Sequence, residues 1–287
     1  MYIGVNDKSK TINQIFIGVN DKAKLIDNAF IGVNNIAEQL IKKIDFPTYT
    51  GSHAVFGDLN RGRMELYESG TLVMPAGWEI DIFVVGGGAR GGQTKGSSTD
   101  PTGGGGGGYT KTIRNFWARN QEKYDVYVGG SDGNTAIKHK QLGDVIVGLH
   151  GKYWEVGQIW FGGDGGSGGG DAGLYKESSN YNGGDGGSDG KDGQLPAGRG
   201  GRGQGTTTRM FGESNGTLYA GGGGGGAGDK TGNPGAGGLG GGGTGGRGTI
   251  GISGTPNTGG GGGGARFNST TGVINGGSGI VIIRWGY

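Results

Sequence analysis

One glycine-rich segment sets the strongest limit on how this chain can fold. Residues 157–279 hold 52 of the 79 glycines in a chain of 287 residues, with pure glycine at 221–226 and 259–264. Such a segment lacks the side chains needed for a hydrophobic core, and glycine loses more backbone entropy on ordering than any other residue. It must therefore either remain a flexible linker or become ordered through its backbone alone.

The flanks of this segment favour order over a flexible linker. Apolar, strand-like stretches at 78–85 and 279–285 bracket it, and structureless loops of this length are uncommon inside compact domains. A glycine chain in the polyproline II conformation has about three residues per turn and no internal hydrogen bonds. Because glycine keeps its amide, such helices can bond sideways to one another. We therefore expect residues 157–278 to form a bundle of polyglycine II helices with exposed tips.

The first 46 residues contain a repeat. The pattern aromatic-Ile-Gly-Val-Asn recurs every 14 residues, at 2–6, 16–20 and 30–34. Each unit reads as a small hairpin, because turn-forming Asn and Asp residues separate two short apolar stretches. Such a hairpin is too small to be stable alone, so it must stack or pair with other chains. The apolar spacing at 36–44 predicts a short helix instead.

Residues 47–156, together with 279–287, are predicted to form a β scaffold. The stretch 78–85 alternates at first and then becomes fully apolar, which predicts a strand buried on one face and then on both. Further strands are expected at 71–73, 109–116, 123–128, 135–139, 144–149 and 153–156. The expected fold is therefore all-β plus polyglycine II. It comprises a small N-terminal repeat segment (1–46) and a β-sandwich-like scaffold with residues 157–278 inserted between its strands.

Bulk composition argues against several classes of function. The formal net charge is +2, from 26 basic and 24 acidic residues, which does not favour capture of nucleic acid or of an anionic membrane. There is no cysteine, and no stretch reaches the ~18 apolar residues of a membrane span. The N-terminus shows no signal-peptide core. We expect no nucleic-acid partner and no membrane insertion.

Four segments resemble a known family when taken in order. Residues 72–88, 107–111, 127–130 and 276–285 resemble the successive strands of the glycine-rich domain found in many phage tail fibre proteins. The glycine zone is similar in kind to phage adhesins built from polyglycine II. The 14-residue repeat resembles repeats in structural proteins of phages that infect Gram-positive bacteria.

This resemblance implies a phage tail fibre or receptor-binding protein that contacts the bacterial surface. The implied partners are a bacterial receptor (a glycan or an outer protein), other tail proteins, and further copies of the chain in a homotrimer. The implied location is the virion, with release to the outside. Two alternatives remain open, a purely structural filament or fibre-shaft protein and, with less support, an ice-binding protein.

Specificity in such a protein must reside in side chains, because a glycine backbone has none with which to discriminate. The non-glycine clusters at 174–182, 206–211 and 255–258 are therefore interpreted as tips. Tyrosine, arginine and similar residues there give large contact areas. The receptor-contact candidates are Tyr175, Tyr181, Asn182, Arg209, Met210, Phe211 and Asn257. Trp154, Trp160 and Phe161 are assigned to packing beneath the bundle, with a sugar-stacking platform as the alternative.

No enzymatic or cofactor chemistry can be selected from this sequence. GxGxxG matches are expected by chance in so glycine-rich a chain. Five aspartates among the glycines could suggest calcium, but their spacing does not match the calcium-binding nonapeptide repeat. The three histidines, with no cysteine, do not make a complete zinc site. We expect no catalytic residue, metal or cofactor, and therefore not an enzyme.

Overall fold

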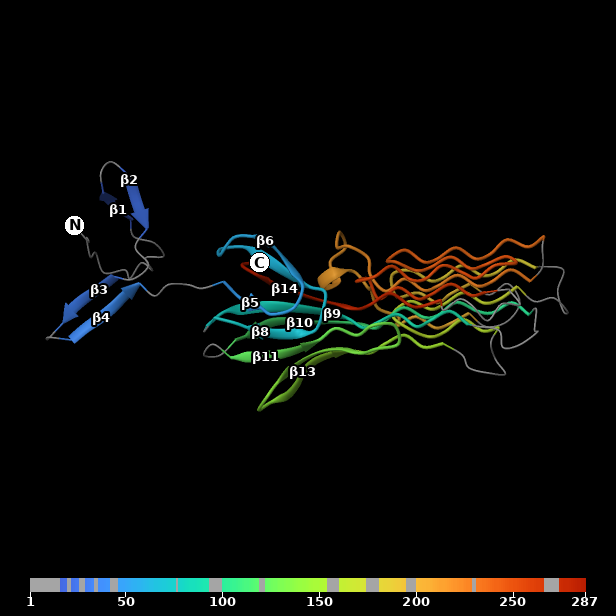
Figure 1. Cartoon of the computed structure of the whole chain (residues 1–287), viewed down its shortest axis with the longest axis horizontal. Helices are drawn as coiled ribbons and strands as arrows, with labels where there is room; N and C mark the ends of the chain where they lie inside the picture. The colour runs from blue at the N-terminus through green and yellow to red at the C-terminus, as the bar shows by residue number, and fades with distance from the viewer. Residues whose placement is uncertain are drawn as a thin grey trace. The chain divides into compact units, whose positions relative to one another are not determined.

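The computed structural model divides the chain into two compact units, 1–46 and 47–287, and each is treated separately (Figure 1). The residues that the structure describes are 16–19, 22–25, 29–33, 36–41, 46–75, 77–92, 100–118, 122–153, 160–173, 181–194, 200–228, 231–265 and 274–287. The first unit consists of antiparallel pairs of strands. Strand β1 (Phe16–Val19) pairs with β2 (Lys22–Leu25), and β3 (Ala29–Val33) pairs with β4 (Ile36–Ile41).

The pair β1–β2 confirms the hairpin prediction for the second repeat unit, while residues 2–6 of the first lie outside the described part. The helix predicted at 36–44 is wrong, because Ile36–Ile41 forms a strand. Val33 faces Ile36 in the register of this pair, so the chain folds directly back on β3. Backbone pairing with a neighbouring strand here outweighs the local apolar spacing.

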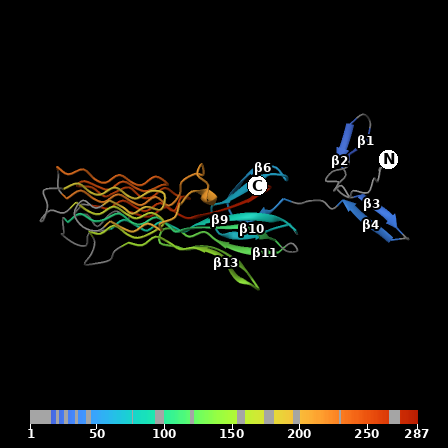
Figure 2. The same ribbon diagram turned by 180° about the vertical axis from the view of Figure 1, so that it is seen from behind.

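The second unit contains two antiparallel sheets of five strands each (Figures 1 and 2). The first sheet has the order β10 (Thr110–Trp117), β9 (Glu79–Val85), β14 (Ile280–Trp285), β7 (Gly62–Leu66), β6 (His53–Gly57). The second has the order β13 (Gly143–Gly148), β12 (Thr135–His139), β11 (Lys123–Tyr127), β8 (Gly70–Val73), β5 (Thr48–Tyr49). Strands β5, β6 and β7 were not predicted. In the expected strand 153–156, Tyr153 is not in a strand and the rest lies outside the described residues.

Strand β14 closes the first sheet. It lies between β9 and β7, with Ile282 opposite Phe83 on one side and opposite Glu65 on the other. This confirms the prediction that 78–85 and 279–285 share one sheet. The C-terminal end of the glycine zone is therefore anchored in the first sheet, whereas the strand before the zone, β13, belongs to the second sheet. This anchoring limits the backbone entropy of the adjoining runs.

The hydrophobic core lies on both faces of β9 and β14. On one face, Ile82 and Ile283 belong to a buried cluster that also contains Leu72, Tyr124 and Ile137 from the second sheet. On the opposite face, a second buried cluster is formed by Phe83, Val85, Phe211, Tyr219, Ala220, Ile280 and Ile282. The predicted change in β9 from burial on one face to burial on both is therefore confirmed. The segment 209–220 covers this opposite face of the first sheet.

Beyond the sheets, extended runs of chain lie side by side without strand assignment (Figure 1). We call them the glycine lattice, defined as residues 86–92, 102–109, 162–173, 181–194, 200–204, 220–228, 235–246, 251–254, 259–265 and 274–279. In the described part of the chain, the one helical element is the 3₁₀ turn η1 (Met210–Gly212). No helix among those residues is long and apolar enough to cross a membrane.

Hydrogen bonding in the lattice repeats every three residues. Successive backbone amides of the run 102–109 donate to different neighbouring runs, and every third amide returns to the same neighbour. Thr102, Gly105 and Gly108 donate to the carbonyls of Ala265, Gly262 and Gly259, each over 2.8 Å. The run 220–228 behaves in the same way. Gly221, Gly224 and Ala227 donate to Gly240, Gly243 and Gly246, and Gly222, Gly225 and Gly228 donate to Gly187, Gly184 and Tyr181.

This packing leaves no room for side chains between runs. A Cβ built on Gly225 would lie 1.8 Å from the carbonyl oxygen of Asp171, and one on Gly223 would lie 2.0 Å from that of Gly262. Neither glycine has a positive φ. Close approach of one backbone to another, and not an unusual backbone angle, therefore makes glycine necessary at these positions.

Short polar side chains satisfy amides at the margins of the lattice. Asn182, Asp185 and Ser188 each accept a backbone N–H, from Asn233, Ala236 and Leu239 respectively, over 2.7 Å. The acceptors are three residues apart, and so are the donors. These side chains thus continue the threefold pattern where backbone carbonyls do not serve as acceptors.

Candidate contact surfaces at the two ends of the glycine lattice

The glycine lattice has two ends with different surroundings. At its proximal end, Gly86, Gly108 and Gly279 lead directly into or out of the first sheet. Its distal end is defined by residues 92, 102, 173, 181, 228 and 265, which are joined by backbone hydrogen bonds. Gly228 donates to Tyr181 over 2.7 Å, Gly173 to Gly226 over 2.9 Å, and Thr102 to Ala265 over 2.8 Å. The chain therefore leaves and re-enters several runs at this one end.

Only part of the predicted contact set lies at the distal end. Tyr181 is half-buried and Asn182 is exposed there, while Tyr175 lies outside the described residues. The Asn182 side chain accepts the Asn233 N–H, so part of its hydrogen-bonding capacity is used within the lattice. Contact with a receptor by these residues stays a prediction.

Trp160 and Phe161, for which the sequence predicts packing beneath the bundle, lie at the distal end. The Trp160 carbonyl accepts the amide of Ala172 over 2.8 Å, and a Cβ on Gly103 would lie 2.1 Å from the Phe161 carbonyl oxygen. Both Trp160 and Phe161 are half-buried and thus present part of their surface. In the sequence, these two residues follow the β scaffold closely. They lie at the distal end because neighbouring runs of the lattice are antiparallel.

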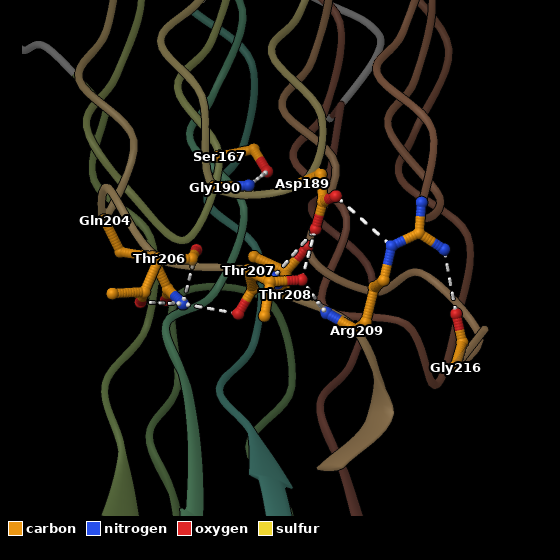
Figure 3. A network of polar contacts seen from close by, with 9 residues as sticks. All are labelled: Ser167, Asp189, Gly190, Gln204, Thr206, Thr207, Thr208, Arg209 and Gly216. Carbon is orange, nitrogen blue, oxygen red and sulfur yellow. Dashed lines mark hydrogen bonds and ion pairs between the residues drawn. The ribbon is translucent and has the colours of Figure 1, made fainter. Parts of the chain in front are cut away.

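The predicted tip at 206–211 lies instead at the proximal end, where a polar network fastens it to the lattice (Figure 3). Asp189 is the centre of this network. Its carboxylate accepts the Thr207 hydroxyl, the Thr208 amide at 3.3 Å and the Arg209 Nε at 3.2 Å. Arg209 also donates to the carbonyl of Gly216 over 3.1 Å. The Gln204 side-chain amide bonds to Thr110 and to Thr206, which ties the same segment to β10.

Because of these bonds, we expect Asp189 to make a pH-dependent contribution to the stability of the fold. The Thr207 hydroxyl, followed by Arg209 and the Thr208 amide, holds the pKa of this carboxyl below its ordinary value. Stability from a lowered pKa is present at neutral pH and is lost as the pH falls below about 4. Asp189 has a φ of 55°, which asparagine also tolerates. We expect Asp189→Asn to lower the unfolding free energy by roughly 1 kcal/mol at pH 7.

The measurement is the thermal midpoint of both proteins at pH 7 and at pH 3. The difference in thermal midpoint between wild type and Asp189→Asn should be smaller at pH 3, because protonation removes the charge from the wild-type carboxyl. An equal gap at both values would contradict this account. The change Asp144→Asn is a suitable control, since Asp144 pairs with Lys138 on an exposed strand.

Phe211 and its surroundings form the second proximal feature. Phe211 is 2% exposed and packs against Phe83, with ring centroids 5.8 Å apart. Met210 packs against the same cluster. The expectation that this segment is an exposed tip is therefore wrong for Phe211, because the open face of the first sheet needs an apolar cover. Asn257 is also proximal, with its amide bonded to the Ser278 hydroxyl over 2.8 Å.

Arg284 stacks on the Phe211 ring, with its guanidinium carbon 4.0 Å from the centroid. It is 5% exposed and bonds to Asp81 over 3.0 Å and to Glu213 over 2.7 Å. Arg284 lowers the pKa of the Glu213 carboxyl. A cavity of about 260 Å³ adjoins this cluster, lined by Glu79, Ile80, Asp81, Asn115, Arg284, Trp285, Gly286 and Tyr287. Within the cluster, Arg284 is paired with both Asp81 and Glu213. These pairs fasten the 209–220 segment to the sheet.

Three aspartates of the glycine zone serve the lattice backbone through their side chains. Asp164 accepts the Arg202 amide, Asp185 that of Ala236, and Asp192 that of Gly203, over 2.7 to 2.8 Å. Among the described residues, no group of three His, Asp or Glu side chains is arranged to hold a metal ion. These carboxylates are spread along the lattice margins as amide acceptors.

Comparison with known protein families shows which family this chain belongs to. A family model for a glycine-rich domain matches residues 67–286. The chain belongs to the glycine-rich domain family. No curated protein matches the chain. The glycine-rich domain includes strands β8 to β14 and the whole glycine lattice, whereas β5, β6 and β7 precede it. The first sheet is therefore shared between the family domain and the residues before it, since β14 pairs with β7.

Proposed function

We propose that this chain is a phage tail fibre or receptor-binding protein that contacts the bacterial surface. The observation that carries the proposal is that the described ends of several runs are bonded to one another at the distal end of the lattice. A backbone lattice with clamped ends projects that end away from the sheets, and the side chains found there include Trp160, Tyr181 and Asn182. Aromatic and amide groups on a rigid support are well suited to glycan or protein contacts.

The proposal includes a finer description of the fold. We propose that the lattice is a bundle of polyglycine II helices extending from a β-sandwich. The return of every third amide to the same neighbour supports this, because polyproline II geometry has about three residues per turn. The hydrophobic cluster shared by both sheets supports the sandwich.

The family resemblance adds to this proposal, because segments 72–88 and 276–285 resemble glycine-rich domains of tail fibre proteins. In the virion, the partners would be a bacterial receptor, other tail proteins and further copies of the chain, as a homotrimer. The charged clusters at Asp189 and Arg284 are paired internally, which supports a role without catalysis.

The experiment is binding of fluorescently labelled full-length protein to a panel of Gram-positive and Gram-negative cells. Replacing Trp160, Tyr181 and Asn182 together by serine should weaken binding about tenfold or more, which corresponds to about 1.4 kcal/mol. The control is Leu142→Ser, which changes a residue that is 70% exposed at the β12–β13 turn. Equal binding by both variants would overturn the assignment to the distal end.

The repeats at the N-terminus favour a second candidate, a structural filament. The pairs β1–β2 and β3–β4 are isolated two-stranded sheets, and such pairs require further partners for stability. A filament protein would polymerise through these repeats and bind none of the cells. Light scattering on the purified protein, with the same cell panel, distinguishes the two functions.

A further inference from the structure

The edges of the two sheets differ in how well they are protected. Unpaired edge strands invite pairing with other chains, and proteins usually blunt them with bulges, charges or short length. Strand β5 has two residues. Strand β10 carries a bulge beside Arg114, and the register of β13 shifts next to Asp144. Strand β6 shows none of these devices, since its five residues pair with β7 in unbroken register and carry no Asp, Glu, Lys or Arg.

The hydrogen bonds around β6 show which of its backbone groups point outward. Tyr67 donates to Ser52 over 2.9 Å, and Asp58 donates to Arg61 over 3.0 Å. Antiparallel bonding alternates along a strand, so Ala54 and Phe56 also direct their backbone groups toward β7. The intervening residues, which direct their N–H and C=O groups away from β7, are His53, Val55 and Gly57. No hydrogen bond from a described residue reaches these groups (Figures 1 and 2 show β6 at the margin of its sheet).

The side chains of β6 leave apolar surface along this edge. Val55 lies opposite Met64, so both side chains share one face of the sheet. Met64 is 1% exposed in the main core cluster, whereas Val55 is 44% exposed. The core face therefore ends at β6 without cover. On the other face Phe56 is 43% exposed, with the Arg63 guanidinium over its ring.

We propose that β6 pairs antiparallel with β6 of a second copy of this chain, about a twofold axis at Val55. The edge can pair with itself, because the outward-directed groups of His53, Val55 and Gly57 meet those of Gly57, Val55 and His53 of the copy. Pairing then places Val55 opposite Val55 and His53 opposite Gly57 of the copy. No like charges oppose each other, and the core faces of both molecules become continuous. This interface is separate from the distal end and does not depend on its function; in a homotrimer it would join two trimers.

Opposite charges at residue 55 test this register. Val55→Lys and Val55→Asp each place like charges opposite one another, so either variant alone should sediment at about half the mass of the wild type. An equimolar mixture should restore the wild-type mass, since lysine then opposes aspartate. Circular dichroism checks that both variants are folded. The control Leu142→Lys, on the β12–β13 turn, should keep the wild-type mass.

A cross-link provides an independent measurement, because the chain has no cysteine of its own. In this pairing the Cα atoms of the two residues 55 lie about 5.5 Å apart, within reach of a disulfide. Val55→Cys should therefore form a covalent dimer on mild oxidation much faster than Leu142→Cys. Equal rates for the two variants, or a wild type with the same mass as Val55→Lys, would overturn the proposal.

Discussion

Replacing Gly225 by alanine is expected to destabilise the glycine lattice strongly. The new Cβ would lie 1.8 Å from the Asp171 carbonyl oxygen and 2.5 Å from its carbon. Both atoms belong to a backbone that is fixed by bonds to other runs, so neither can move as a side chain could. Overpacking in ordinary cores costs about 1–3 kcal/mol. We expect about 3 kcal/mol or more here, a fall of roughly 6–12 °C in the thermal midpoint.

Gly130→Ala is the matched control for this experiment. Nothing lies within 4 Å of a Cβ at Gly130, and its φ is not positive. The added methyl group should leave stability unchanged or raise it by about 0.4–1 kcal/mol, because it restricts the unfolded chain. Calorimetry on the two variants gives the comparison. Similar midpoints for both would show that the runs are not held in fixed contact.

Loss of Arg284 is expected to have the second large effect. Its guanidinium is buried between Asp81 and Glu213 and covers the ring of Phe211. Arg284→Met keeps most of the apolar stem but leaves the Asp81 carboxylate, 12% exposed, without its buried partner. Breaking a buried pair in this way costs about 3–5 kcal/mol. We expect a loss of this size in chemical unfolding, together with loosening of the 209–220 segment.

Arg114→Met separates the effect of burial from the effect of charge. Arg114 bonds to the same Asp81 oxygen at 3.1 Å, but its side chain is 48% exposed. Exposed pairs contribute about 0–1 kcal/mol, so this variant should unfold close to the wild type. If Arg114→Met and Arg284→Met were equally destabilised, burial would not be the deciding factor. Hydrogen exchange of the Phe211 and Tyr219 amides would report the state of the covering segment.

Much of the β scaffold could be predicted because its signals are local. The stretch 79–85 changes from alternating to continuous apolar character, and the burial of β9 follows that change. The strands β5, β6 and β7 were missed because they mix polar and apolar residues at a sheet margin. In β7, Met64 and Leu66 alternate with Arg63 and Glu65, which is the local pattern of a strand buried on one face.

The glycine lattice also has a local signature in the sequence. Asn182, Asp185 and Ser188 are separated by pairs of glycines, as are Asp164 and Ser167. This spacing of three is the same as the spacing of the hydrogen bonds. It could have indicated that these side chains accept backbone amides, a more specific role than that of exposed turn residues. The aspartates would then have been separated from any calcium interpretation on the sequence alone.

The sequence by itself determined that this chain must order its glycine zone through backbone contacts, and that the zone ends in a strand that pairs with 78–85. Glycine content is a local property, and so is the apolar character of residues 78–85 and 279–285. Only the tertiary structure decided which non-glycine clusters lie at which end. Thr206–Phe211 are far from β9 in sequence, yet the uncovered face of β9 and β14 draws them back to the sheet. Trp160, close to the scaffold in sequence, lies at the opposite end because the runs are antiparallel. Position along a folded backbone lattice depends on the direction of each run, which no local pattern of residues specifies.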